Sequence, residues 1–123
     1  MAYLDNEIYD NGLTALAGSN RVLHICSSEP STFGGVASVT LGNKTNPTIG
    51  SPADRSGGGR EVTVSAINDG NVTGTATASH WALVDTTGDG RLLAAQELNA
   101  TQSVTDGNDF TLTSFTIGIP GPV

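Results

Sequence analysis

The chain has 123 residues, a formal net charge of −7 and only five Lys or Arg residues. This length suits one domain that buries about two-thirds of its extended-chain surface, so it needs no covalent cross-links. So few basic residues cannot form the stripe that follows nucleic-acid phosphates, which argues against binding to DNA or to an anionic membrane surface. Cys26 is the single cysteine, so no intramolecular disulfide forms, and we expect neither a secretory signal nor a membrane span.

Helical spacing is confined to the segment 3–16, in which Leu4, Ile8 and, further on, Leu13 could share one face. We therefore expect residues 1–20 to form a short N-terminal helix or arm. Two roles remain open for it. It either covers the open end of the β domain or docks on a neighbouring subunit.

Strand signals follow the arm. Apolar alternation predicts a strand over Arg21–Ser27, which Glu29-Pro30 ends because proline cannot donate to a ladder. A second short strand is predicted over Val36–Leu41. The segment Gly42–Gly59 has almost no large apolar residue, so it is predicted to be a long surface loop.

Alternation resumes after this loop. A strand is predicted over 61–67, with Val62, Val64 and Ala66 facing the core. Asn68–Asn71 is predicted to be a turn, and Val72–Ser79 is predicted to be the next strand.

The strongest local signal is a hairpin over residues 79–98. Two apolar runs, His80–Val84 and Leu92–Ala95, flank the Gly- and Asp-rich turn Asp85–Gly90. Both faces of both runs are apolar, so we expect the hairpin in the middle of a sheet that is covered on two sides, with Trp81 in the core. Thr105–Asn108 is predicted to be a further turn.

The last apolar segment changes phase. Phe110 and Leu112 share one parity, whereas Phe115 and Ile117 share the other, which predicts a bulge or a strand that changes sheet at Thr113-Ser114. Short strands with turn signals between them predict a single-domain all-β sandwich, of jelly-roll or Ig-like type, over residues 21–123.

Metal-binding signals are weak. The turn Asp85–Gly90 begins like a calcium loop, but its twelfth position is Gln96 and its flanks are strands, so a plain hairpin turn is the better interpretation. His24, Cys26 and His80 are too few for a zinc site and are better explained as a buried thiol and hydrogen-bonded imidazoles.

No catalytic or cofactor-binding motif stands out, and we expect the protein not to be an enzyme. His80 and Asp85 could be grouped with many serines, but no serine lies in a nucleophile elbow. The Gly57–Gly59 run lacks the lysine of a phosphate loop. A sugar-binding module usually presents exposed aromatic rings, whereas Trp81 lies in a core-like strand.

The order of several segments resembles that of small virion proteins of tailed bacteriophages. The segments that carry this resemblance span most of the chain: Leu4–Leu16, Val22–Pro30, Ser79–Asp85 with Leu92-Leu93, and Phe115–Pro120.

The resemblance implies a capsid decoration (cement) protein without catalytic, cofactor or metal residues. Such a protein is made in the host cytoplasm, binds the major capsid protein on the outer surface of the virion and clamps neighbouring subunits as a homotrimer. The alternatives are a tail or head-fibre protein and, less favoured, a carbohydrate-binding host-recognition module. The residues expected to dock on the capsid or on a neighbouring subunit come from both ends of the chain: Tyr3, Leu4, Ile8, Tyr9, Ile119, Pro120 and Pro122.

Overall fold

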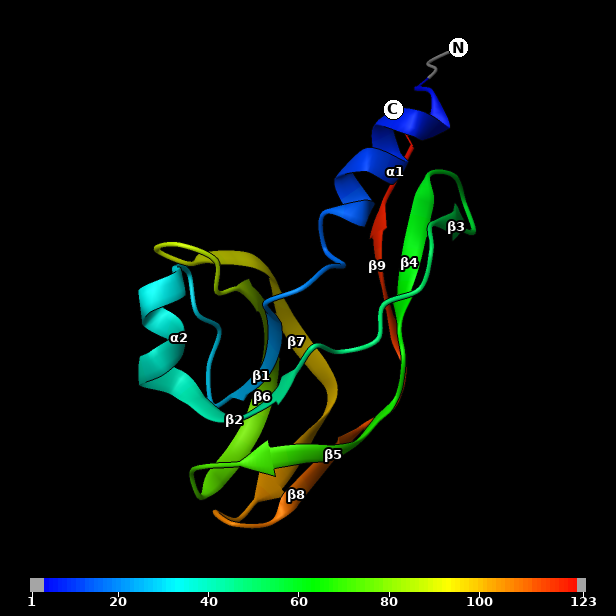
Figure 1. Cartoon of the computed structure of the whole chain (residues 1–123). Coiled ribbons are helices and arrows are strands. Elements are labelled where there is room, and N and C mark those ends of the chain that lie inside the picture. Colours follow the sequence, from blue (N-terminus) through cyan, green and yellow to red (C-terminus); the bar gives the residue numbers. More distant parts are fainter. Residues whose placement is uncertain (1–3, 122–123) are drawn as a thin grey trace.

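The computed structural model describes residues 4–121, which form two short helices and nine strands (Figure 1). The helices are α1 (Asn6–Thr14) and α2 (Phe33–Val39). The strands are β1 (Arg21–Cys26), β2 (Thr40–Thr45), β3 (Ala53–Asp54), β4 (Arg60–Val64), β5 (Ile67–Val72), β6 (Ala76–Asp85), β7 (Arg91–Val104), β8 (Asp109–Leu112) and β9 (Phe115–Ile119). The expected all-β single domain with a short N-terminal helix is confirmed.

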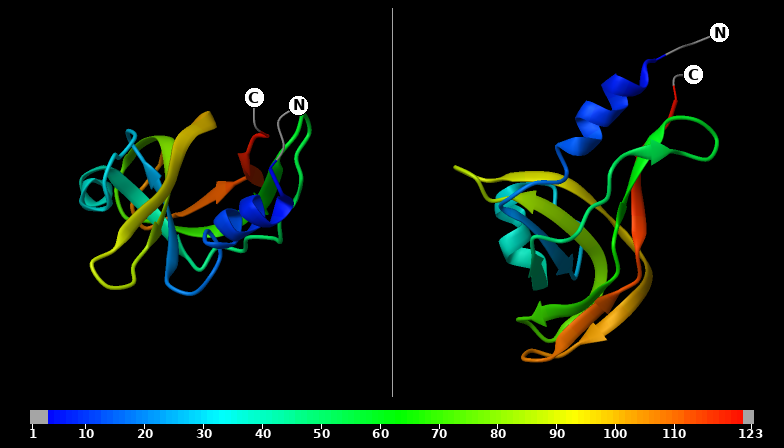
Figure 2. Two further views of the ribbon diagram at one scale, coloured as in Figure 1. Left: turned by 90° about the horizontal axis from the view of Figure 1, so that it is seen from above. Right: turned by 45° about the vertical axis from the view of Figure 1, so that its right-hand side comes forward.

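The strands form two antiparallel sheets. A six-stranded sheet has the order β7-β6-β1-β2-β5-β8, and a three-stranded sheet has the order β3-β4-β9. The larger sheet curls strongly, whereas β4 and β9 extend away from it toward α1 and both chain ends (Figures 1 and 2). The turn 105–108 joins the two edge strands of the larger sheet, β7 and β8, so the curl brings these edges toward each other.

The predicted hairpin is confirmed by the pairing of β6 with β7. Its turn contains Gly88 and Gly90 at φ values of 63° and 82°, a conformation that glycine adopts at little cost. Trp81 is buried as expected, with 4% of its surface exposed. Only β6 lies inside the sheet, between β7 and β1, because β7 is an edge strand.

Both faces of β6 are covered, as its continuous apolar run predicts. On the inner face, Leu83 belongs to a core cluster that includes Phe110 of β8. On the outer face, Ala82 packs in a second cluster with Cys26 and with Val36 of α2. Helix α2 therefore covers the outside of the curled sheet (Figure 1).

The predicted change of phase near the C-terminus is confirmed as a change of sheet. Strand β8 pairs with β5 in the larger sheet, and β9 pairs with β4 in the smaller one. Thr113 and Ser114 lie between them. The apolar face of β9 still reaches the inner core, where the Phe115 ring centroid lies 4.7 Å from that of Trp81.

The N-terminal helix α1 packs on the three-stranded sheet. Asp5 caps it by accepting a hydrogen bond of 2.8 Å from the backbone N–H of Glu7. Tyr9 and Leu13 are its buried side chains, and both face the protein. The helix is thus an integral part of the fold at the end where β4 and β9 project.

The predicted strand over 36–41 is wrong, because most of it belongs to α2. Thr32 begins this helix by accepting a 2.9 Å hydrogen bond from the backbone N–H of Gly35, a cap that outweighs the β preference of Val36 and Val39. The predicted loop 42–59 is partly wrong as well. Its first residues continue β2, and Ala53–Asp54 forms β3.

The predictions for 66–79 are wrong in register. Asn68–Asn71 is not a turn but lies within β5, and Val72–Ser79 is divided between the end of β5 and the start of β6. Ala66 is exposed and lies outside β4. The reason lies across the sheet, because Gly70 leaves room for the ring of Phe110, which a Cβ at this position would overlap.

Candidate functional site

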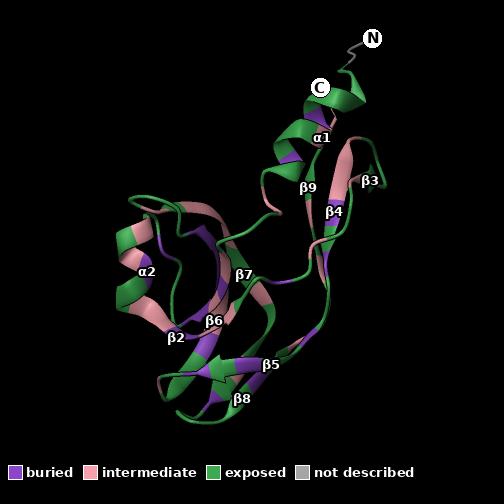
Figure 3. Ribbon diagram, in the orientation of Figure 1, coloured by how far each residue is buried: buried purple, intermediate pink, exposed green. Residues whose placement is uncertain are grey.

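Three large apolar side chains are exposed at one end of the molecule. Leu4 is 39% exposed, Ile8 58% and Ile119 37%, and they are the exposed large hydrophobic residues of the range 4–121. Helix α1 and the end of β9 lie here, at the top of Figure 1, and Figure 3 shows the outward side of α1 as exposed. We call Leu4, Ile8 and Ile119 the terminal patch.

Helix α1 and strand β9 build the terminal patch together. Ile8 and Gly12 lie one turn apart on the same side of α1. The Ile119 Cδ1 atom lies only 3.5 Å from the position that a Cβ of Gly12 would take. Ile119 therefore packs against the helix at Gly12, at ordinary van der Waals distance, on the side of α1 that carries Ile8.

The other predicted docking residues are placed differently. Pro120 is exposed beside Ile119. Tyr9 is only 3% exposed, so its prediction as a docking residue is corrected. The Tyr9 hydroxyl lies 3.8 Å from the position that a Cβ of Gly121 would take, so Tyr9 packs against the C-terminal segment. Tyr3 and Pro122 lie outside the described residues.

Arg60 of β4 holds this end of the molecule together. Its Nε donates to Asp10 Oδ1 at 2.9 Å and its Nη2 to Asp10 Oδ2 at 3.2 Å, a two-pronged contact with α1. Its Nη1 donates to Asp54 of β3 at 2.7 Å. The hydrogen bonds that the Arg60 guanidinium donates to these two carboxylates raise its pKa. Helix α1 is thus fixed to the sheet by a charged side chain that the sequence reasoning did not single out.

The residues considered for catalysis do not converge. Asp85 accepts a 2.9 Å hydrogen bond from the backbone N–H of Thr87 and lies 3.2 Å from Arg21, and these contacts lower the pKa of its carboxyl. His80 instead contacts Ser79, with its Nδ1 2.8 Å from Oγ. His80 and Asp85 are five positions apart on β6, which corresponds to about 16 Å of strand. The turn that resembles a calcium loop therefore uses Asp85 to bind Arg21.

His24 lies beside a small apolar pocket of about 280 Å³ under α2. The Thr40 hydroxyl donates its one proton to the Gly42 carbonyl. Its oxygen therefore accepts the hydrogen bond from His24 Nδ1, which lies 2.8 Å away. Burial lowers the pKa of His24 and raises the pKa of the Cys26 thiol to about 11. Within residues 4–121, no three His, Cys, Asp or Glu side chains gather as a metal site would require.

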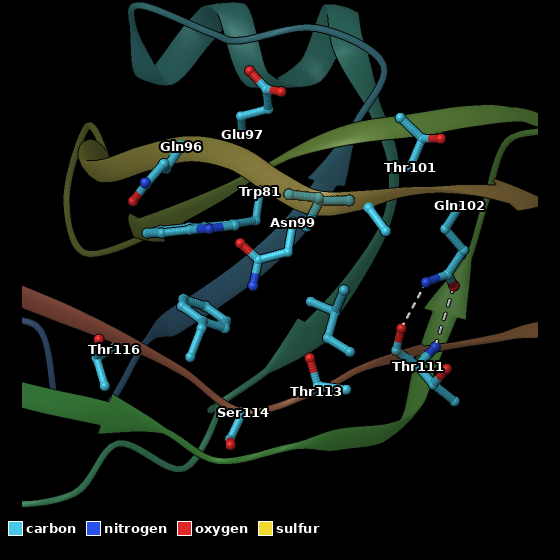
Figure 4. A pocket seen from close by; sticks show the side chains of 14 residues that line it. Trp81, Gln96, Glu97, Asn99, Thr101, Gln102, Thr111, Thr113, Ser114 and Thr116 are labelled. Carbon is cyan, nitrogen blue, oxygen red and sulfur yellow. Dashed lines mark hydrogen bonds between the residues drawn. The ribbon is translucent and has the colours of Figure 1, made fainter.

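A second surface feature is a groove of about 670 Å³ between β7 and the segment that links β8 to β9. One wall is the run 96–102 and the other is the run 111–116, which includes Phe115, and Trp81 of β6 also lines the groove (Figure 4). The pairing of β6 with β7 is irregular at this point. Between two paired positions, β6 has one residue, Ser79, whereas β7 has four, residues 98–101, so β7 bulges at the groove.

Gln102 closes one end of this groove. Its Nε2 donates to the Thr111 carbonyl at 2.8 Å, and its Oε1 accepts from the Thr111 N–H at 3.4 Å (Figure 4). Sequence reasoning missed the groove. The available signal was the polar run that follows the apolar residues of β7, which breaks the alternation of a half-buried strand.

Within the described part of the chain, no helix is long and apolar enough to cross a membrane. Comparison with known proteins found no matching family model, no similar curated protein and no similar solved structure.

Proposed function

We propose that this protein is a capsid decoration (cement) protein of a tailed bacteriophage. It binds the outer surface of the major capsid protein shell as a homotrimer and stabilises the shell, and its role is binding rather than catalysis. The observation that carries the proposal is the terminal patch, where Leu4, Ile8 of α1 and Ile119 of β9 are exposed at the same end of the molecule.

The geometry of the terminal patch supports docking. Exposed apolar side chains that gather at one place are typical of an interaction surface. Arg60 and the buried Tyr9 hold α1 in place beneath the patch, so binding would not have to order this helix first. A rigid patch costs less conformational entropy on binding than a loose arm.

Charge and multivalency agree with this role. A net charge of −7 suits the outside of a shell that contains DNA, because the protein has little attraction for nucleic acid. A trimer that contacts several capsid subunits gains effective concentration at each contact, so individually weak patches suffice. The segments that resemble phage virion proteins include α1 and β9, the two elements of the patch.

The test is co-sedimentation of the purified protein with phage heads assembled without it. We expect saturable binding near one trimer per local threefold position and a higher melting temperature of the heads. Ile8→Asp, which places a charge in the terminal patch, should abolish binding. Asn11→Asp, which adds the same charge on exposed α1 outside the patch, should bind like the unchanged protein.

Two results would contradict the proposal. Absence of binding to heads, with binding to tails or fibres instead, would assign the protein to another part of the virion. Equal binding by the Ile8→Asp variant would show that the terminal patch is not the docking surface.

A further inference from the structure

The groove between β7 and the 111–116 segment lies apart from the terminal patch and has no part in the proposed capsid contact. Its walls are rich in amide and hydroxyl side chains. The polar uncharged residues that line it are Gln96, Asn99, Thr101, Gln102, Thr111, Thr113, Ser114 and Thr116. A volume of about 670 Å³ is within the range of small-molecule clefts.

The groove has almost no charge. Among its 14 lining residues, Glu97 is the one charged residue. In Figure 4 the Glu97 carboxylate points toward the side of the sheet that α2 covers, away from the groove, whereas Asn99 points into it. A charged ligand would find no counter-charge here, so the lining favours a neutral ligand with many hydrogen-bonding groups.

The floor is apolar. The rings of Trp81 and Phe115 contact each other with an interplanar angle of 36°, and Leu112 adds an aliphatic side chain. Trp81 is only 4% exposed, so the apolar surface that a ligand could reach comes mainly from the half-buried Phe115 and Leu112. A sugar ring combines C–H faces with hydroxyl edges, which matches an apolar floor between amide and hydroxyl walls.

A peptide strand fits the groove less well. Adding a strand requires a regular ladder edge on which N–H and C=O groups alternate. One wall bulges at residues 98–101, and the other contains Thr113 and Ser114, which lie outside β8 and β9. An added strand would have to form its hydrogen bonds at these two interruptions. Irregular edges of this kind are a known way in which sheets avoid pairing with another strand.

We propose that this groove binds a neutral oligosaccharide, with Asn99 and Thr113 donating and accepting hydrogen bonds from opposite walls. This site is independent of the capsid contact, so the virion protein would carry a glycan-binding surface besides its docking surface. Failure of either proposal leaves the other standing.

The test begins with the labelled full-length protein on an array of neutral and charged glycans, followed by calorimetric titration with the glycan retained best. We expect a neutral oligosaccharide to bind. Asn99→Ala should weaken binding by about tenfold, the loss expected for one hydrogen bond, without a change in Tm. The matched control Asn68→Ala removes an exposed amide on β5, outside the groove, and should bind normally.

Three outcomes would overturn the proposal. The first is that no neutral glycan is retained, and the second is that Asn68→Ala weakens binding as much as Asn99→Ala. The third is protection of the 96–101 amides from hydrogen exchange on phage heads without glycan binding, which would assign the groove to a protein strand.

Discussion

The side-chain amide of Gln102 takes the place of a backbone ladder pair with Thr111. Both of its hydrogen bonds run to the backbone N–H and C=O of Thr111, so a side chain of β7 reaches the edge of β8. These strands are consecutive, yet β7 pairs with β6 and β8 pairs with β5. The curled sheet is therefore bridged at this point by one side chain, and the space beyond it is the groove.

Replacing Gln102 should lower the free energy of unfolding. Gln102→Leu keeps a side chain of similar size but removes the partner of the exposed Thr111 groups, which should cost about 0.5–1.5 kcal/mol. Gln96→Leu, on the same strand but exposed and without such a bond, should change stability by less than about 0.5 kcal/mol. Urea denaturation followed by Trp81 fluorescence measures both variants. Equal effects would show that the bridge contributes nothing.

The contact between Gly70 and Phe110 predicts a size-dependent defect. Phe110 is 1% exposed, and a methyl group at position 70 would overlap its ring, so Gly70→Ala should destabilise the protein by about 1–3 kcal/mol. Phe110→Leu should partly relieve the overlap. The double variant should then be more stable than the sum of the single effects predicts, and additivity in a double-mutant cycle would contradict this explanation.

Loss of the Arg60 contacts should loosen α1 but not the curled sheet. In Arg60→Ala, Asp10 and Asp54 lose their partner, so the α1 amides should exchange hydrogen faster while the β6 amides keep their protection. Arg55→Ala is the control, because Arg55 donates only within its own turn, to the Gly58 carbonyl. Hydrogen exchange measured by mass spectrometry distinguishes these regions, and uniform acceleration would indicate global destabilisation instead. Capsid binding should fall in Arg60→Ala if the terminal patch is the docking surface.

The contacts of Asp85 predict a loss of stability in acid. Its pKa in the folded protein is below the ordinary value of 3.8, so the folded state favours the charged carboxylate. This stabilisation is fully present at pH values well above 3.8, the ordinary pKa of the carboxyl. As the pH falls from there toward the lower pKa of the folded protein, the unfolded chain binds the proton first and the stabilisation is lost. Asp85→Asn should be less stable at pH 7 and show a weaker decline between pH 5 and 3. Asp89→Asn, on the exposed part of the same turn, should keep the decline of the unchanged protein.

Local signals predicted the segments in which neighbouring residues decide the structure. The hairpin depends on Gly88 and Gly90 between two apolar runs, and the change of sheet at Thr113-Ser114 is visible in the parity of the residues around it. The helix Asn6–Thr14 followed from apolar spacing. Each of these signals lies within about 20 residues, where turn and capping chemistry act directly.

The wrong predictions involve partners that are distant in the sequence. Residues 68–71 have the composition of a turn, yet they form a strand because β8 and β2 pair on either side of β5. Val36 was predicted to lie in a strand, but it lies in α2, where it packs against Ala82 of β6, far along the chain. Tyr9 was expected to face a partner and is instead buried below the C-terminal segment, because α1 and β9 meet only in the folded chain.

The sequence by itself determined the all-β class, the acidic charge, the central hairpin with its buried tryptophan and the short N-terminal helix, since composition, alternation and turn residues act over short distances. Tertiary structure alone decided which strands share an edge, that Arg60 fixes α1 to β4, and that Leu4, Ile8 and Ile119 form one surface. It also decided that Gln102 bridges β7 and β8 beside an open groove. These features depend on sheet curl and long-range pairing, in which a residue's partner is set by the whole fold rather than by its neighbours in the chain.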